Sequence, residues 1–234
     1  MNLFSRRRRL EPLLLDYERT RIELHPSSRK RRRSVAKEPY TVAWLEESLR
    51  PGDVLYDVGA NVGAYSLVAA VAQPEAHVLA FEPGFESYAA LCQNLVLNKL
   101  GGRVTALPVA LGARSQLASF EYRHLGPGQA QHHLGDNPPF EPEFEQRLIE
   151  VRLDDLVELL GLPHPTHMKV DVDGSELAVL SGADRVLRSE TLRELQLEVD
   201  PGDRRIEEAL AAYGFSAVAT NETPQVLNIR FARA

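Results

Sequence analysis

The stretch VLYDVGANVGAYS at residues 54–66 combines a carboxylate and two glycines in a pattern that suits ligand binding. An apolar run reaches Asp57, a turn with Gly59 and Gly63 follows, and a helical pattern begins. Glycines in such a turn let the backbone approach a ligand closely. The turn lacks the lysine of a phosphate-binding loop, and a carboxylate repels a pyrophosphate but attracts an ammonium. The stretch therefore favours S-adenosylmethionine over NAD or ATP, unless Asp57 only caps the turn.

A second carboxylate, Glu82, ends the next apolar run in the sequence VLAFEP. It lies nineteen residues after Gly63, where a doubly wound fold places an acid that accepts hydrogen bonds from two ribose hydroxyls. Pro83 then favours the start of a helix. We expect Glu82 to hold the ribose of the nucleoside. The alternative is an exposed acid that only complements the dipole of the following helix.

A third group of charged residues occurs in MKVDVDGSE, residues 168–176. In a strand, Lys169, Asp171 and Asp173 project to one side, and Glu176 follows. Carboxylates that converge at a ligand-binding edge need a lysine or a metal to compensate them. We expect these four residues to be catalytic or to bind the acceptor. Mg²⁺ would suit the carboxylates, but the spacing matches no recognised metal cage; an ordinary polar loop is the alternative.

The elements that position these residues alternate between strands and helices. Strands are expected at residues 54–58, 78–81, 104–109, 118–122, 148–153, 167–172, 195–199, 216–219 and 226–231, and helices at 38–49, 64–72, 86–97, 177–187 and 206–213. This alternation predicts an α/β fold with a mostly parallel, doubly wound sheet. The carboxyl ends of its strands then meet at one edge, where ligands bind.

A long irregular segment, residues 123–147, separates two of these strands. Loops of this length inside a domain are usually lids or mobile segments. The segment holds His124, His132 and His133, which are candidate general bases because histidine titrates near neutral pH. Acceptor specificity is expected to lie largely in this loop.

Charge divides the chain at about residue 37. Residues 1–37 carry twelve Lys or Arg and four Asp or Glu, whereas the whole chain has a net charge of −6. The sequence therefore predicts a basic N-terminal arm over residues 1–37, with a short helix within 10–24, and an acidic domain over 38–234. The arm is either solvated and mobile or contacts anionic lipid, nucleic acid or a second subunit. An acidic domain repels nucleic acid, so a polyanion would have to bind through the arm.

Composition indicates a folded, reduced protein. Apolar residues make up 44% of the chain, which argues against global disorder. Cys92 is the single cysteine, so no intramolecular disulfide can form. The sequence has no apolar run of 18 residues, the length that a membrane-spanning helix needs. No apolar stretch follows the first arginines, as it would in a signal peptide. We expect a cytoplasmic protein.

The three stretches together resemble the FkbM family of S-adenosylmethionine-dependent methyltransferases. The matching segments are DVGANVGAYS at 57–66, AFEP at 80–83, NLVLN at 94–98, PVAL at 108–111, LDDL at 153–156, KVDVDGSE at 169–176 and VLNIRF at 226–231. The resemblance implies a class I methyltransferase fold, Rossmann-like, with an antiparallel last strand. It also implies transfer to a hydroxyl of a sugar, polyketide or other small metabolite. The cofactor-binding residues expected on this basis are Asp57, Gly59, Asn61, Gly63, Tyr65, Glu82, Pro83 and Ala110.

Three other functions compete with this interpretation. The sequence NPPF at 137–140 spells a signature of methyltransferases that modify base amines, but the residues before it cannot form the buried strand which that motif ends. A nucleic-acid methyltransferase tethered by the basic arm is a second possibility. A non-catalytic cofactor-binding protein is the third, and the presence of Asp57, Glu82 and the acidic stretch argues against it.

Overall fold

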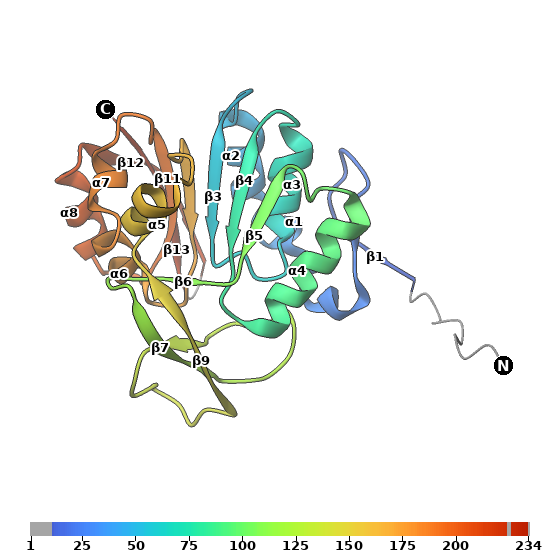
Figure 1. The fold of residues 1–234 in the computed structure, drawn as a ribbon. Coiled ribbons are helices and arrows are strands. Elements are labelled where there is room, and N and C mark those ends of the chain that lie inside the picture. Colours follow the sequence, from blue (N-terminus) through green and yellow to red (C-terminus); the bar gives the residue numbers. More distant parts are fainter. Residues whose placement is uncertain (1–10, 224–225, 234) are drawn as a thin grey trace.

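The computed structural model describes residues 11–223 and 226–233, which fold around a seven-stranded sheet (Figure 1). The strand order is β12-β13-β11-β10-β3-β4-β5. All neighbours are parallel except those of β13, which is antiparallel to β11 and β12. The strands are β3 (Val54–Val58), β4 (His77–Phe81), β5 (Val104–Leu107), β10 (His167–Val170), β11 (Glu194–Val199), β12 (Phe215–Glu222) and β13 (Leu227–Arg233). The predicted doubly wound sheet with an antiparallel last strand is confirmed.

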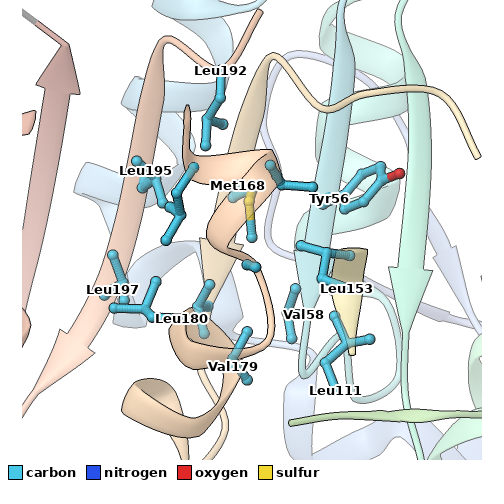
Figure 2. Close-up of a cluster of buried hydrophobic side chains, with 14 of the residues drawn as sticks. Tyr56, Val58, Leu111, Leu153, Met168, Val179, Leu180, Leu192, Leu195 and Leu197 are labelled. Atoms are coloured by element: carbon cyan, nitrogen blue, oxygen red, sulfur yellow. The ribbon is translucent and has the colours of Figure 1, made fainter. Parts of the chain in front are cut away.

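Helices cover both faces of the sheet because the strands are apolar on both sides. Successive strand residues point to opposite faces, so Leu55 packs with one helix layer and Tyr56 with the other. The first layer contains α2 (Pro39–Ser48), α3 (Ala64–Ala72) and α4 (Phe85–Asn98). The second contains α5 (Leu153–Leu160), α6 (Glu176–Ser181), α7 (Asp184–Arg188) and α8 (Arg205–Ala211). Figure 2 shows the second layer, where Leu197 of β11 lies beside Leu180 of α6.

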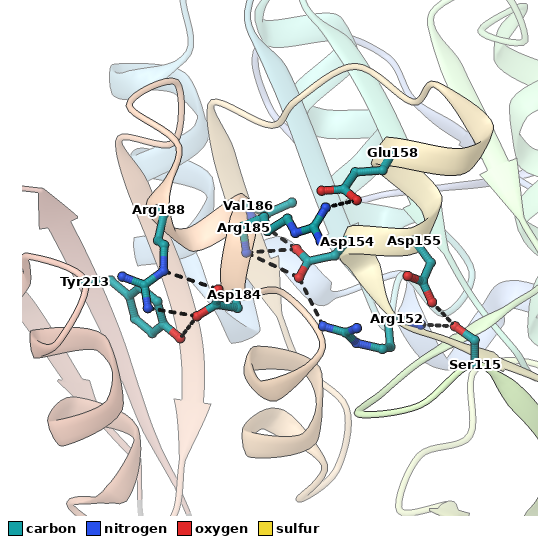
Figure 3. Close-up of polar contacts among 10 residues, drawn as sticks. All are labelled: Ser115, Arg152, Asp154, Asp155, Glu158, Asp184, Arg185, Val186, Arg188 and Tyr213. Atoms are coloured by element: carbon teal, nitrogen blue, oxygen red, sulfur yellow. Dashed lines mark hydrogen bonds and ion pairs between the residues drawn. The ribbon is translucent and has the colours of Figure 1, made fainter.

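A buried carboxylate fixes α7 to α5. Asp154, only 2% exposed, accepts hydrogen bonds from the backbone N–H groups of Arg185 and Val186 at 3.1 Å each (Figure 3). These groups lie in the first turn of α7, where N–H groups lack partners within the helix. Arg152 donates to the same carboxylate at 3.2 Å. The LDDL segment thus anchors the helices that follow β10.

The segment expected as one helix over 177–187 forms two helices, α6 and α7. The break falls at Gly182, where a Cβ atom would lie 2.0 Å from the carbonyl oxygen of Gly112. The backbones meet too closely there for a side chain. The apolar spacing is helical on both sides of the break, which explains the incorrect prediction.

A small four-stranded sheet lies against the carboxyl ends of the central strands (Figure 1). Its strands are β6 (Ala110–Leu111), β7 (Gln116–Tyr122), β8 (His133–Leu134) and β9 (Phe144–Val151), in the order β6-β9-β7-β8. The strands predicted on either side of the long loop pair with each other, since β7 and β9 are antiparallel. The loop is shorter than predicted because β9 begins at Phe144 and β8 occupies part of it.

Residues 11–37 pack on the domain instead of forming the helix expected within 10–24. They contain β1 (Leu13–Leu14), β2 (Glu23–Leu24), the 3-10 helix η1 (Pro26–Arg31) and α1 (Ser34–Lys37). Leu15, Tyr17, Ile22 and Leu24 are buried with α2, α3 and α4 in one apolar cluster. Their spacing of two residues is that of strands. The boundary expected at residue 38 therefore divides side chains that share a core. The four arginines at 6–9 of the predicted arm lie outside the described part of the chain.

Candidate active site

Three neighbouring cavities open at the carboxyl edge of the sheet. The first has apolar walls made by Phe81, Val109, Leu111, Phe120 and Leu134. The second is lined by the glycine turn and the start of α3, and by polar side chains of the N-terminal segment, β10, β11 and β13. The third is lined by residues within 123–140, by residues within 173–177 and by the segment from the end of β11 to the start of α8. Of the predicted cofactor residues, Gly59, Asn61, Glu82, Pro83 and Ala110 line the first cavity.

Glu82 lies at the end of β4 and faces the first cavity. Its two oxygens accept hydrogen bonds from the backbone N–H groups of Asn61 and Gly84, each at 2.8 Å. Burial raises the pKa of Glu82 to about 7, and these two hydrogen bonds oppose the rise. A carboxylate has about four lone-pair sites. Glu82 can therefore brace the glycine turn and still accept hydrogen bonds from a ligand.

The glycines of the turn meet different needs. Gly59 has a φ of +81°, and a Cβ atom there would lie 1.9 Å from the carbonyl oxygen of Asp171. Gly63 has a φ of +83°, and its Cβ would lie 2.3 Å from a side-chain carbon of Leu91 in α4. Gly59 borders two cavities, whereas Gly63 lies outside the lining of all three. Gly63 therefore serves close packing in this structure.

Asp57 lies under the turn, 1% exposed, and outside the lining of these cavities. Its Oδ2 accepts a hydrogen bond from Ser66 at the start of α3. Burial raises the pKa of Asp57, and the Lys169 ammonium opposes the rise. The Oδ1 atom has no hydrogen-bond partner among the described residues. Direct contact between Asp57 and the methionyl group stays a prediction.

Lys169 forms a buried ion pair at the centre of the site. Its ammonium lies 2.8 Å from Oδ2 of Asp171 and 4.9 Å from the centre of the Tyr65 ring. Burial opposes the charge of Lys169, but the carboxylates of Asp171, Glu38 and Asp57 keep its pKa above the usual value. Lys169, Asp171 and Tyr65 all line the second cavity. The structure thus brings predicted cofactor and catalytic residues together here.

Asp173 and Glu176 have different positions. Asp173 has a φ of +53°, lines all three cavities, and accepts a hydrogen bond from the backbone of Gln131 at 2.6 Å. Glu176 accepts hydrogen bonds from the backbone of Val172 and Gly174 and lines only the third cavity. Glu176 therefore shapes the loop after β10, and Asp173 lies where the cavities join.

The N-terminal segment closes the site together with the long loop. The Arg31 guanidinium donates to the carbonyl oxygens of Gly128 and Gln129, at 2.9 and 3.4 Å. Asn61 also donates to the Gln129 carbonyl, at 2.7 Å. Sequence reasoning missed Arg31 because it treated residues 1–37 as a separate arm. Other residues that line the second cavity were also missed, because the sequence around them has no spacing typical of a site. They are Ser34, Lys37, Glu38, Tyr40, Glu198 and Asn228.

The three loop histidines are not equivalent. His132 packs against Phe120 and Tyr122, with ring centroids 5.5 and 4.8 Å away, and lines the first and third cavities. Burial lowers its pKa to about 4. His133 lines the third cavity. His124 is exposed beside Glu143.

Two predicted alternatives find no matching geometry. The NPPF segment at 137–140 lies between β8 and β9, not at the end of β10. Within residues 11–223 and 226–233, no group of three His, Cys, Asp or Glu side chains is arranged to hold a metal ion.

In the same part of the chain, no helix is long and apolar enough to cross a membrane.

Comparisons with known proteins identify the family. The methyltransferase FkbM domain matches residues 57–217. The chain is 31% identical over 173 residues to the hexuronic acid methyltransferase AglP of Haloferax volcanii, covering 73% of this chain and 67% of that protein. It is 30% identical over 200 residues to the 31-O-demethyl-FK506 methyltransferase FkbM of Streptomyces tacrolimicus, covering 74% and 76%.

The fold matches solved methyltransferase structures. Magnesium protoporphyrin IX methyltransferase of Synechocystis, solved with bound S-adenosylmethionine, has a TM-score of 0.53 and 14% identity, covering 86% of this chain and 80% of that one. The precorrin-6y C5,15-methyltransferase of Geobacter metallireducens also has a TM-score of 0.53, at 17% identity, covering 84% and 87%. These likenesses show the fold alone. The domain match and the sequence relatives place this chain in the FkbM family of S-adenosylmethionine-dependent methyltransferases.

Proposed function

We propose that this protein transfers the methyl group of S-adenosylmethionine to a hydroxyl oxygen of a small, hydroxylated acceptor such as a sugar or polyketide. The observation that carries the proposal is the junction of the first and second cavities. Gly59, Asn61, Asp171 and Asp173 line both. A donor whose adenosine part lies in the first cavity would thus present its methyl group at this junction to an acceptor in the second.

The first cavity has the groups that would bind the adenosine part of S-adenosylmethionine. Its apolar walls suit an adenine ring, and the Glu82 carboxylate, 6% exposed, suits the ribose hydroxyls. The backbone at Gly59 is open to a ligand because no side chain covers it. When bound, S-adenosylmethionine supplies a methyl group that its sulfonium has already activated. The protein then has to align the two substrates and remove a proton, and alignment is worth about 7–11 kcal/mol.

The second cavity suits a polar acceptor. Its volume is about 490 Å³, within the range of roughly 300–1,000 Å³ usual for small-molecule sites. Four carboxylates, three amides, two phenols and the cations of Arg31, Lys37 and Lys169 line it, and these groups form hydrogen bonds with hydroxyls. The names of two relatives, a hexuronic acid methyltransferase and an O-demethyl-FK506 methyltransferase, support a hydroxylated acceptor.

Mass spectrometry would test the proposal. The purified chain is incubated with S-adenosylmethionine and, separately, with methyl glucuronide, methyl glucoside or a hydroxylated macrolide. We expect a gain of one methyl group on oxygen with at least one acceptor, and binding of S-adenosylhomocysteine but not NAD by calorimetry. Binding of the cofactor without transfer to any of these acceptors would contradict the proposed function.

A further inference from the structure

Glu198 lies where the second and third cavities meet. The side chain is partly exposed and lines both cavities. Strands β10 and β11 pair in parallel up to Val170 and Leu197, so Glu198 is the position beside Asp171 at the ligand-binding edge. An acceptor that reaches the second cavity from the third would pass Glu198.

The Glu198 carboxylate differs from the other acids around the second cavity. Those acids are Glu38, Asp171, Asp173 and Glu198. Thr41 donates to the first, Lys169 to the second and the backbone of Gln131 to the third. Within the part of the chain that the structure describes, the Glu198 carboxylate has no hydrogen bond or ion pair. Its oxygens are therefore available to a hydroxyl in the cavity.

We propose that Glu198 is the general base that takes the proton from the acceptor hydroxyl, an inference that rests on the proposed function. The bond between the acceptor oxygen and the methyl carbon forms while the bond between that carbon and the donor sulfur breaks. The hydroxyl proton moves to Glu198 and then to solvent. The sulfonium charge is lost as the proton is lost, so atoms and charges balance.

The surrounding charges suit this role. Burial raises the pKa of Glu198 to about 7, and the carboxylates of Asp171 and Glu38 act in the same direction. The ammonium groups of Lys169 and Lys37 oppose the rise, and the Tyr40 phenol also faces this group. Burial disfavours the charge of Asp171, but Lys169 lowers the pKa of its carboxyl. A pair of acids with separated pKa values is typical of acid–base sites.

His132 is the rival base. It lines the first and third cavities but not the second. Its pKa, lowered by burial to about 4, makes it a weak proton acceptor at neutral pH. Glu198 is better placed and better matched to that pH.

Steady-state kinetics test the proposal with the acceptor that the wild type methylates fastest in the panel above. Glu198→Gln should lower kcat at pH 8 by about 100-fold or more, with the KM for S-adenosylmethionine within a few-fold. The wild-type kcat should fall tenfold per pH unit below about pH 7, and Glu198→Gln should lose this dependence. Glu198→Asp should restore part of the activity. Glu208→Gln, the same change on the exposed face of α8, is the matched control and should leave kcat unchanged.

Thermal unfolding without cofactor gives a readout separate from activity. A carboxyl whose pKa is higher in the folded protein binds its proton more tightly there, so the folded protein loses stability as pH rises through the unfolded and then the folded pKa. Glu198→Gln removes this loss. We expect a Tm above that of the wild type at pH 8 and equal to it at pH 4.

The outcomes separate the two proposals. A wild type that binds cofactor but methylates no acceptor overturns the proposed function and the role of Glu198 with it. An active wild type with a folded, equally active Glu198→Gln variant overturns only the role of Glu198. So does a lower Tm for Glu198→Gln at pH 8, which would indicate a structural carboxylate. Loss of the pH dependence in His132→Gln instead would assign the base to His132.

Discussion

The first and second cavities differ in what makes their walls. The first is lined by the glycine turn, the end of β4 and apolar side chains drawn from Val58 to Val172. The second is lined by the same turn and the start of α3, together with charged and polar side chains from the N-terminal segment, β10, β11 and β13. Apolar side chains therefore distinguish the first cavity, which we propose for the donor, and charged side chains distinguish the second, which we propose for the acceptor. Substitutions in the first cavity should lower cofactor affinity, whereas substitutions in the second should lower turnover or raise the acceptor KM.

Gly59→Ala should have the largest effect, because it acts on the backbone where both cavities meet. The left-handed φ costs roughly 1–2 kcal/mol for alanine, and overpacking against the Asp171 carbonyl adds about 1–3 kcal/mol. We expect loss of cofactor binding and a clear drop in Tm. Gly52→Ala is the matched control, since its φ is +83° and no atom lies within 4 Å of the added Cβ. A Gly59→Ala variant no less stable than Gly52→Ala would contradict the close approach.

Asp171→Asn should lower turnover while it leaves the affinity for S-adenosylmethionine within a few-fold. The variant leaves the buried Lys169 ammonium without its 2.8 Å partner and alters the charge beside the acceptor. Misalignment at the junction of the two cavities can cost about 100-fold in kcat, measured beside calorimetry with S-adenosylhomocysteine. An equal loss in cofactor affinity would show that Asp171 acts by holding the cofactor, and normal turnover would remove it from the catalytic residues.

Glu82→Ala should show the reverse pattern. It removes ligand hydrogen bonds to a charged group, worth about 1.5–3 kcal/mol, and two that brace the turn. Cofactor affinity should fall by roughly tenfold to a hundredfold, while kcat at saturating cofactor stays within a few-fold. Circular dichroism checks the fold. Unchanged affinity in a folded variant would exclude Glu82 from cofactor binding.

Arg31→Met should have the smallest effect. The variant keeps much of the apolar stem but loses the donors to Gly128 and Gln129, each worth about 1 kcal/mol. We expect the acceptor KM to rise by roughly threefold to tenfold and the cofactor affinity to stay unchanged. Arg29→Met is the control, because Arg29 is exposed on the same 3-10 helix. Equal effects of both variants would point to general charge and not to the loop contact.

The sequence predicted more of the lining of the first cavity than of the second, for a physical reason. The turn at 57–66 and Glu82 follow directly from strands whose type and order were predictable, so their meeting at one edge was too. Glu198 and Arg31 reach the second cavity only through sheet order and through packing of residues 11–37, which no local pattern encodes. The same limit explains the missed break at Gly182, which depends on contact with Gly112.

The packing of the N-terminal segment has a consequence for folding during synthesis. The backbone N–H groups of Glu23 and His25 donate to Asn98 and Asn94, 75 and 69 residues later in the chain. A ribosome adds about 5–20 residues per second, so these groups wait several seconds for their partners. Ile22 and Leu24, 0% exposed in the folded protein, remain uncovered during that time. Arginines precede and follow these two apolar residues in the sequence, and such charge favours solubility until α4 is available to cover them.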